Sequence, residues 1–162
     1  MNANPIYPDA KRPNTFQDGL EFQDYVVDIL TKEIGLPLSN YSSKKWQYNV
    51  GENKQGVEIK LDNRCTETNR LSIEIAEKSR ASMPNYTMSG IYRDDNTWLY
   101  VHGNREIFFI FPKRYLVMLH RKNLYKEKTM PTIKTFYLPM PDAEYYALIS
   151  FRNGIKKMNK VS

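Results

Sequence analysis

The sequence predicts a single α/β (α+β) domain over residues 1–162, in which a mixed β-sheet is flanked by helices. Three observations lead to this prediction. An amphipathic helical pattern covers residues 16–34, several short segments between residues 45 and 138 have the apolar alternation or apolar runs of strands, and short helical patterns follow Pro112 and Pro141. Helices distributed among strands in this way pack on the faces of a sheet.

The N-terminal region is expected to be an arm followed by one long helix. Residues 1–15 contain three prolines and no periodicity, which is typical of an arm on the surface. Thr15 is a plausible N-cap for the helix over 16–34, and Gly35 followed by Pro37 ends it. The apolar stripe of this helix is expected to face the core. Its members are Leu20, Val27, Leu30 and Ile34, widened by Phe22, Val26 and Ile29.

Three strands are predicted next. The first covers residues 45–50, and the turn over 51–56 separates it from the second, over 57–62. The third covers 71–78, after a polar connection of about eight residues. We expect the second and third strands to pair as an antiparallel hairpin, because both alternate sharply and the connection between them is short.

The same signals predict the rest of the domain. Residues 79–96 are expected to form a long loop, and residues 153–162 a basic C-terminal tail. The elements expected between them are strands over 97–101 and 106–111, a short helix after Pro112, a strand over 133–138 and a final helix from Pro141 to about Arg152.

Composition limits the classes of function. The single cysteine, Cys65, excludes an intramolecular disulfide and a zinc site built on several thiolates, and it favours a reducing compartment. The N-terminus has no apolar signal region and no apolar run could span a membrane, so we expect a cytoplasmic protein without a membrane partner. The net charge is +6, and residues 1–42 hold three basic and six acidic residues, so the excess lies further along. A basic surface favours nucleic acid as a partner, although a charge excess also simply aids solubility.

One group of charged residues indicates chemistry. Glu58, Lys60 and Asp62 share one face of a predicted strand, and Glu74 lies on the next strand. Carboxylates crowded together repel one another unless a cation neutralises them. Hard oxygen ligands suit Mg²⁺ or Mn²⁺, which also bind phosphate. Lys60 would orient or activate the attacking water, or stabilise the charge that develops on the phosphate.

This arrangement resembles the PD-(D/E)XK nuclease superfamily over roughly residues 16–120, and the resemblance implies that the mixed β-sheet flanked by helices is restriction-endonuclease-like. In that superfamily a helix carries an acid, one strand ends in Asp, and the next strand carries Glu-x-Lys. Asp62 matches the strand-ending Asp and Glu74 matches the Glu. The resemblance implies a Mg²⁺-dependent or Mn²⁺-dependent endonuclease that hydrolyses the phosphodiester bonds of DNA, with Asp62 and Glu74 as metal ligands.

The lysine of the motif departs from the family pattern. Ala76 stands where the family has lysine, two residues after Glu74. The substitute would be Lys60 on the neighbouring strand or, as second choice, Lys78. Glu58-Ile59-Lys60 also reads as Glu-x-Lys, which makes Glu58 an alternative metal ligand.

The helix departs from the pattern as well. Gly19 is followed four residues later by Gln23 rather than an acid. Gln23 is expected to point inward, where its amide could hold a water of the metal shell. Glu21 is the nearest acid, but it points some 200° away from Gln23 at about 100° per residue. Both remain candidates.

Further basic residues are candidate phosphate contacts. Residues 113–134 contain seven basic residues and one acid, and the C-terminal tail adds more. The residues singled out are Lys113, Arg114, Arg121, Lys122, Lys156 and Lys157. His102 and His120 are expected in a hairpin turn and at a helix end, without a catalytic role, and Cys65 has no evident base to make it a nucleophile.

Three hypotheses follow. The chain is a metal-dependent DNA endonuclease, or a nucleic-acid-binding module that keeps the fold without the chemistry, or a subunit of a larger assembly. A homodimer is possible, since palindromic cleavage requires one, but the sequence has no clear dimer signature.

Overall fold

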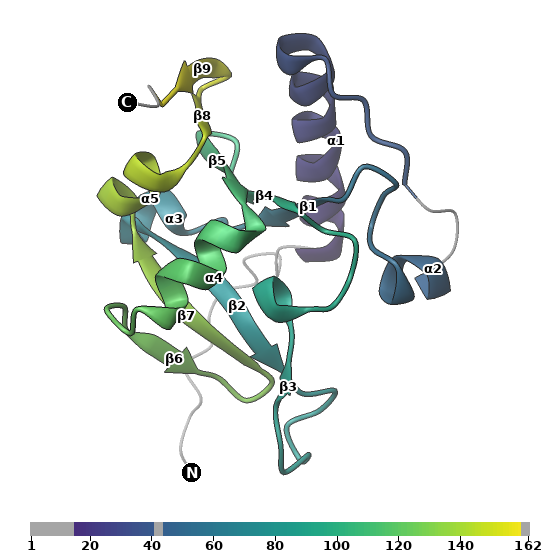
Figure 1. Cartoon of the computed structure of the whole chain (residues 1–162), viewed down its shortest axis with the longest axis vertical. Coiled ribbons are helices and arrows are strands. Elements are labelled where there is room, and N and C mark those ends of the chain that lie inside the picture. Colours follow the sequence, from purple (N-terminus) through teal and green to yellow (C-terminus); the bar gives the residue numbers. More distant parts are fainter. Residues whose placement is uncertain (1–14, 41–43, 160–162) are drawn as a thin grey trace, which may run out of the picture.

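The computed structural model describes residues 15–40 and 44–159, so residues 1–14 of the arm predicted over 1–15 and the last three residues of the predicted tail lie outside it (Figure 1). The elements in chain order are α1 (Thr15–Ile34), α2 (Lys44–Asn49), β1 (Val57–Leu61), α3 (Cys65–Thr68), β2 (Arg70–Glu77), β3 (Thr87–Met88), the 3-10 helix η1 (Gly90–Tyr92), β4 (Leu99–Gly103), β5 (Ile107–Pro112), α4 (Lys113–Arg121), β6 (Glu127–Thr129), β7 (Ile133–Pro139), α5 (Met140–Tyr146), β8 (Ile149–Arg152) and β9 (Ile155–Met158). The fold is a mixed α+β fold, as predicted, but it contains two sheets.

The larger sheet has five strands in the order β1-β4-β5-β8-β9, with β1 parallel to β4 and the other pairs antiparallel. Helix α1 covers one of its faces, beside β1 in Figure 1. Phe22, Val26 and Leu30 of the helix are buried against Val57 and Val101. Leu20 is 41% exposed, so the buried face of α1 is turned from the predicted stripe toward the residues that were expected only to widen it.

The smaller sheet has four strands in the order β3-β2-β7-β6, all antiparallel. Apolar side chains of β2 and β7, such as Ile73 and Phe136, pack with Phe109 and Phe111 of β5. Helices α4 and α5 contribute Leu116 and Ala143 to the same core. This second core holds the two sheets together. In Figure 1, β2, β7 and β6 lie below the larger sheet, and α4 lies in front of the junction.

The predicted hairpin of the strands over 57–62 and 71–78 is wrong, although both strands exist. β1 pairs with β4, and β2 pairs with β7 and β3. The connection between them is not a simple turn, because α3 occupies Cys65–Thr68 and Asn69 then takes a left-handed conformation with φ 55°. This helical turn redirects the chain into a different sheet.

The predicted strand over residues 45–50 is also wrong, since the segment forms α2. The amide of Val50 donates to the carbonyl of Trp46 at 2.8 Å, so the segment satisfies its backbone locally. Trp46 is 57% exposed. An apolar residue at every second position predicts a strand only where a neighbouring strand offers a ladder, and the larger sheet ends at β1.

The C-terminal prediction fails in a different way. Helix α5 ends at Tyr146, and β8 and β9 form a hairpin where a longer helix and a tail were expected. The hairpin turns at Asn153 and Gly154, whose φ values are 49° and 77°. An Asn-Gly pair between short alternating segments is a strong hairpin signal, and the sequence contained it. The predicted loop over 79–96 is mostly irregular but includes the short β3 and η1.

Candidate functional site

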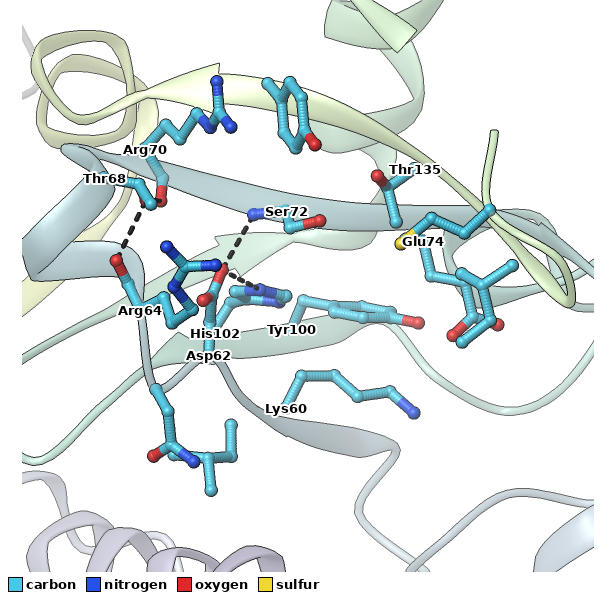
Figure 2. Close-up of a pocket in the computed structure, with 15 residues that line it drawn as sticks. Lys60, Asp62, Arg64, Thr68, Arg70, Ser72, Glu74, Tyr100, His102 and Thr135 are labelled. Atoms are coloured by element: carbon cyan, nitrogen blue, oxygen red, sulfur yellow. Dashed lines mark hydrogen bonds and ion pairs between the residues drawn. The ribbon is translucent and has the colours of Figure 1, made fainter. Parts of the chain in front are cut away.

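A polar cavity of about 430 Å³ lies between β1 and β4 on one side and β2 and β7 on the other (Figure 2). Alternation along the strands explains its polarity. Val57 and Ile59 of β1 face α1, so Lys60 faces the opposite way, toward the smaller sheet. The residues that line it are Lys60, Leu61, Asp62, Asn63, Arg64, Thr68, Arg70, Ser72, Glu74, Tyr100, His102, Met130, Ile133, Thr135 and Tyr137.

Lys60 is held by an ion pair with a buried carboxylate. Its Nζ lies 2.7 Å from Oε1 of Glu58, whose side chain is only 5% exposed. Burial by itself would lower the pKa of Lys60, but the charge of Glu58, with smaller contributions from Glu52 and Glu74, outweighs burial and raises that pKa. Lys60 is therefore a protonated, positively charged group at neutral pH.

Glu52 belongs to the same cluster and was missed in the sequence. It lies in the turn before β1, and Asn53 fixes this turn by accepting a hydrogen bond from the amide of Val57 at 2.9 Å and donating one to its carbonyl at 2.6 Å. Burial and the charge of Glu58 raise the pKa of Glu52 to about 7. Its Oε2 is buried without a hydrogen-bond partner among the described residues. The alternation of apolar and polar residues indicates which side chains of a strand are buried, but it does not apply to a turn. Nothing in the sequence therefore indicated that the carboxylate of Glu52 is buried.

Asp62 lies just beyond the end of β1, where its amide donates to the carbonyl of Gly103 at 2.7 Å. Its Oδ2 accepts a hydrogen bond from the amide of Ser72 at 2.8 Å and lies 3.6 Å from Nε2 of His102. Burial would raise the pKa of Asp62, but His102 and the amides of Ser72 and Arg64 together lower it. Asp62 is thus a carboxylate at neutral pH.

Glu74 reaches the cavity from β2. Its Oε1 accepts a hydrogen bond from the hydroxyl of Ser89 at 2.6 Å. Gly90 brings this segment close to β2, because its φ is +56° and a Cβ there would lie 2.2 Å from the carbonyl oxygen of Glu74. A β-bulge after Glu74 interrupts the alternation, so that Ile75 and Ala76 are both buried. The position that matches the lysine of the family motif is therefore buried.

Several polar groups of the cavity have no hydrogen-bond partner in the described part of the chain. They are the hydroxyl of Tyr100, both ring nitrogens of His102 and the hydroxyl of Thr135. Tyr100 is 2% exposed, and His102 and Thr135 are each 4% exposed. Unpaired buried polar groups are rare in folded proteins and cost free energy. The separation of 3.6 Å between His102 and Asp62 is an ion-pair distance, longer than a hydrogen bond.

Two arginines stand at the edge of the cavity. The guanidinium of Arg70 lies 3.6 Å from the centre of the Tyr137 ring. Arg70 forms no ion pair with any residue in the ranges 15–40 and 44–159. Arg64 is exposed and pairs with Glu67 at 3.1 Å. In Figure 2 both arginines lie on the Asp62 side of the cavity. Each arginine brings a positive charge to this edge, and that of Arg64 is paired with Glu67.

The predicted catalytic residues divide between the cavity and other places. The cavity is lined by Lys60, Asp62 and Glu74. Glu58 does not line the cavity but forms an ion pair with Lys60. The three lining residues meet across two facing sheets, not across a hairpin. Lys78 does not line the cavity, because its Nζ donates to the carbonyl of Met83 at 2.9 Å.

The helix candidates lie elsewhere as well. Gln23 is half-buried on α1, which covers the other face of the sheet. Glu21 lines a separate hollow with Asp18 and Arg105. Leu61 and Asn63 border both hollows, so Glu21 lies across the end of β1 from the cavity.

The predicted phosphate contacts lie on α4 and β9. Arg114, Arg121 and Lys122 are exposed, and so are Lys156 and Lys157. Lys113, in contrast, makes contacts within the protein. Its Nζ lies 3.1 Å from Oδ1 of Asp95 and donates to the carbonyl of Arg93, so it ties the loop before β4 to α4.

One further expectation is corrected. His102 is buried in β4 and lines the cavity, where a surface turn was expected. His120 does lie in the last turn of α4, with its ring between Tyr92 and Glu127. Cys65 is buried, and burial raises the pKa of its thiol to about 12, so it is not a nucleophile at neutral pH.

The chemistry of the donors fits a hard divalent cation, but a complete metal cage is absent. Within the described ranges, neither Asp62 nor Glu74 forms an ion pair with Lys or Arg. Lys60, which lines the same cavity, is paired with Glu58 instead. However, the described residues contain no group of three or more His, Cys, Asp or Glu side chains arranged to hold a metal ion. Figure 2 shows Tyr100 between Asp62 and Glu74. That both bind one metal stays a prediction.

The chain matches no protein-family model, no curated protein and no solved structure at a significant level. The resemblance to PD-(D/E)XK nucleases therefore stays a prediction from short motifs. Within the described ranges, no helix combines the length and apolar character needed to cross a membrane.

Proposed function

We propose that this protein is a metal-dependent endonuclease that hydrolyses phosphodiester bonds of DNA. The observation that carries the proposal is the gathering of Lys60, Asp62 and Glu74 in one cavity from two different sheets. A cation fixed by a buried carboxylate, beside two carboxylates that form no ion pair with Lys or Arg among the described residues, suits a phosphate group and a divalent metal.

Asp62 and Glu74 are the residues that would hold Mg²⁺ or Mn²⁺. Mg²⁺ needs only one or two protein carboxylates when water and substrate phosphate supply its other ligands, so the lack of a cage of three side chains is compatible with it. When bound, the ion supplies positive charge that polarises the phosphate oxygens.

Lys60 would stabilise the negative charge that develops on the phosphate. Of the two roles open to this lysine, charge stabilisation is favoured over proton abstraction from water, because its raised pKa keeps the amine protonated. Glu58 is a positioning residue, since it touches Lys60 at 2.7 Å and lies almost wholly out of solvent.

The test is cleavage of plasmid and single-stranded DNA in the presence of Mg²⁺ or Mn²⁺. Asp62→Asn, Glu74→Gln and Lys60→Met should each reduce the rate by about 100-fold or more. Lys78→Met is the matched control, because Lys78 lies outside the cavity, and it should cleave at the wild-type rate. Cleavage by all three cavity variants at the wild-type rate would reject the assignment.

A second candidate is a binding module with the same fold but without catalysis. The absence of a metal cage in the described residues favours it, together with the contacts of Asp62 to Ser72 and His102. This candidate predicts tight DNA binding that Mn²⁺ does not change, and no cleavage of DNA or RNA. Calorimetric titration with Mn²⁺ separates the two, because only the nuclease needs Asp62-dependent metal binding.

A further inference from the structure

We propose that the cavity receives one nucleotide of a single strand, displaced from its stack, and that the protein therefore selects single-stranded DNA or unpaired segments over intact duplex. This inference rests on the proposed function, whose substrate it specifies. It starts from the polar groups of Tyr100, His102 and Thr135, which line one cavity and have no hydrogen-bond partner among the described residues.

These three groups are placed as a recognition surface. Tyr100 and His102 are alternate residues of β4 and project from the same face, while Thr135 faces them from β7. Each is at least nine-tenths buried. A site that hydrogen-bonds its ligand leaves such groups unsatisfied when the ligand is absent, and it penalises ligands that cannot pair with them. The edge of a nucleobase has the donors and acceptors to do so.

The size of the cavity limits what can enter. Its volume of about 430 Å³ lies at the small end of the range of roughly 300–1,000 Å³ for small-molecule sites. It suits one nucleotide and excludes a stacked base pair. A nucleotide that enters the cavity beside Lys60 must leave its stack, and this is easiest in a single strand.

The entrance has the features of a single-strand site. The guanidinium of Arg70 is stacked at 3.6 Å on the ring of Tyr137, and both residues border the cavity. An aromatic ring beside an arginine offers a flat surface for a neighbouring base and a positive charge for its phosphate. Arg64 adds a second charge at the same edge, as Figure 2 shows.

Binding measured in EDTA tests the inference without requiring cleavage. A labelled oligonucleotide about 12 nucleotides long would be titrated as a single strand and as a duplex, with fluorescence anisotropy as the readout. We expect the wild-type protein to bind the single strand at least tenfold more tightly. Tyr100→Phe and Thr135→Val should each weaken single-strand binding about fivefold and leave duplex binding unchanged.

Thermal unfolding separates recognition from a structural role. Tyr100→Phe and Thr135→Val remove hydroxyls that have no partner in the described chain, so they should not lower the melting temperature. Tyr125→Phe is the matched control, because the hydroxyl of Tyr125 donates to Asp142 at 2.6 Å. This variant should melt at a lower temperature and bind like the wild type.

The two proposals fail separately. Equal affinity for single strand and duplex, or wild-type single-strand binding by both Tyr100→Phe and Thr135→Val, would overturn the single-strand inference even if the protein cleaves DNA. Selective single-strand binding without cleavage in Mg²⁺ or Mn²⁺ would uphold it and overturn only the nuclease proposal.

Discussion

At the scale of single residues, Lys60 and Glu58 depend on each other. The carboxylate of Glu58 is almost fully buried, and it forms an ion pair with Lys60 at 2.7 Å. Removing one member of such a pair leaves a buried charge without compensation, which destabilises the protein beyond the loss of the contact. Activity and stability at this site are therefore linked, and an experiment must separate them.

We predict that Lys60→Met abolishes DNA cleavage and also lowers the free energy of unfolding by about 1–3 kcal/mol, because Glu58 is left unpaired. The double variant Glu58→Gln/Lys60→Met should recover most of the stability and none of the activity. Urea denaturation and a cleavage assay measure the two effects. Recovery of cleavage in the double variant would show that Lys60 acts only on folding.

A second prediction concerns Glu52 and pH. The folded protein keeps a proton on Glu52 up to about pH 7, whereas the unfolded chain loses it near pH 4.5, so folding is favoured less as pH rises through this window. Glu52→Gln removes the effect. Relative to wild type, the variant should gain up to roughly 3 kcal/mol of stability between pH 4.5 and pH 8. Denaturation curves at both pH values measure this gain, and a constant difference would contradict the burial of this carboxyl.

At the scale of elements, the loop around η1 is fitted to β2. Gly90 lies in a left-handed conformation against the backbone of Glu74, and Ser89 bonds the Glu74 carboxylate. The loop thus positions one of the two carboxylates of the cavity. Its sequence gave no sign of this role, because the contact depends on a close approach between segments some fifteen residues apart.

We predict that Gly90→Ala costs about 1–3 kcal/mol of stability, because a Cβ would lie 2.2 Å from the Glu74 carbonyl oxygen. Gly19→Ala is the matched control. Gly19 is in α1 with nothing within 4 Å of a Cβ, so the change should stabilise by about 0.5–1 kcal/mol. Chemical denaturation of both variants provides the comparison. A destabilised Gly19→Ala would show that the packing of α1 differs from the structure.

Elements were predicted best where burial gives one face of a strand or helix a regular pattern. Helix α1, strands β1, β2, β4, β5 and β7, and helix α4 all lie within a few residues of their predicted positions. Which strands pair was predicted poorly, because alternation fixes a face but not a neighbour. The strand β1 could pair with any edge, and its true partner β4 is some forty residues away.

Of the predicted catalytic residues, the cavity contains Lys60, Asp62 and Glu74 but not Glu58, Lys78, Gln23 or Glu21, and that any of them is catalytic stays a prediction. Alternation placed Lys60 and Glu74 on polar faces, and the cavity contains both. Their meeting depends on the angle between two sheets, which a pattern in one strand does not encode. His102 was missed for a related reason, because β4 extends through the residues that were expected to turn.

At the scale of the whole molecule, the net charge of +6 favours binding to a polyanion. Basic residues are spread over α4, β9 and the edge of the cavity, and each that touches a phosphate releases about one counterion. Salt dependence therefore identifies which of these surfaces contacts the nucleic acid.

We predict that Arg64→Ala/Arg70→Ala reduces the slope of log affinity against log salt by roughly 1.5, close to two phosphate contacts. Lys78→Ala should leave the slope unchanged, because its amine is held by Met83 away from the cavity. Anisotropy titrations with single-stranded DNA at several salt concentrations give these slopes. An unchanged slope in the arginine variant would place the phosphate contacts on α4 or β9.

Strand β9 has a consequence beyond nucleic-acid binding. It is the outermost strand of its sheet, every residue of Ile155–Met158 is exposed, and Lys156 and Lys157 stand between two apolar side chains. An open strand edge is a template on which a second copy can add its own strand, and lysines on the edge oppose this by like-charge repulsion. The positive charges of the two lysines thus oppose self-association through this edge. A polyanion that neutralises them removes the barrier, so copies bound along one strand of DNA would be the first to aggregate edge to edge.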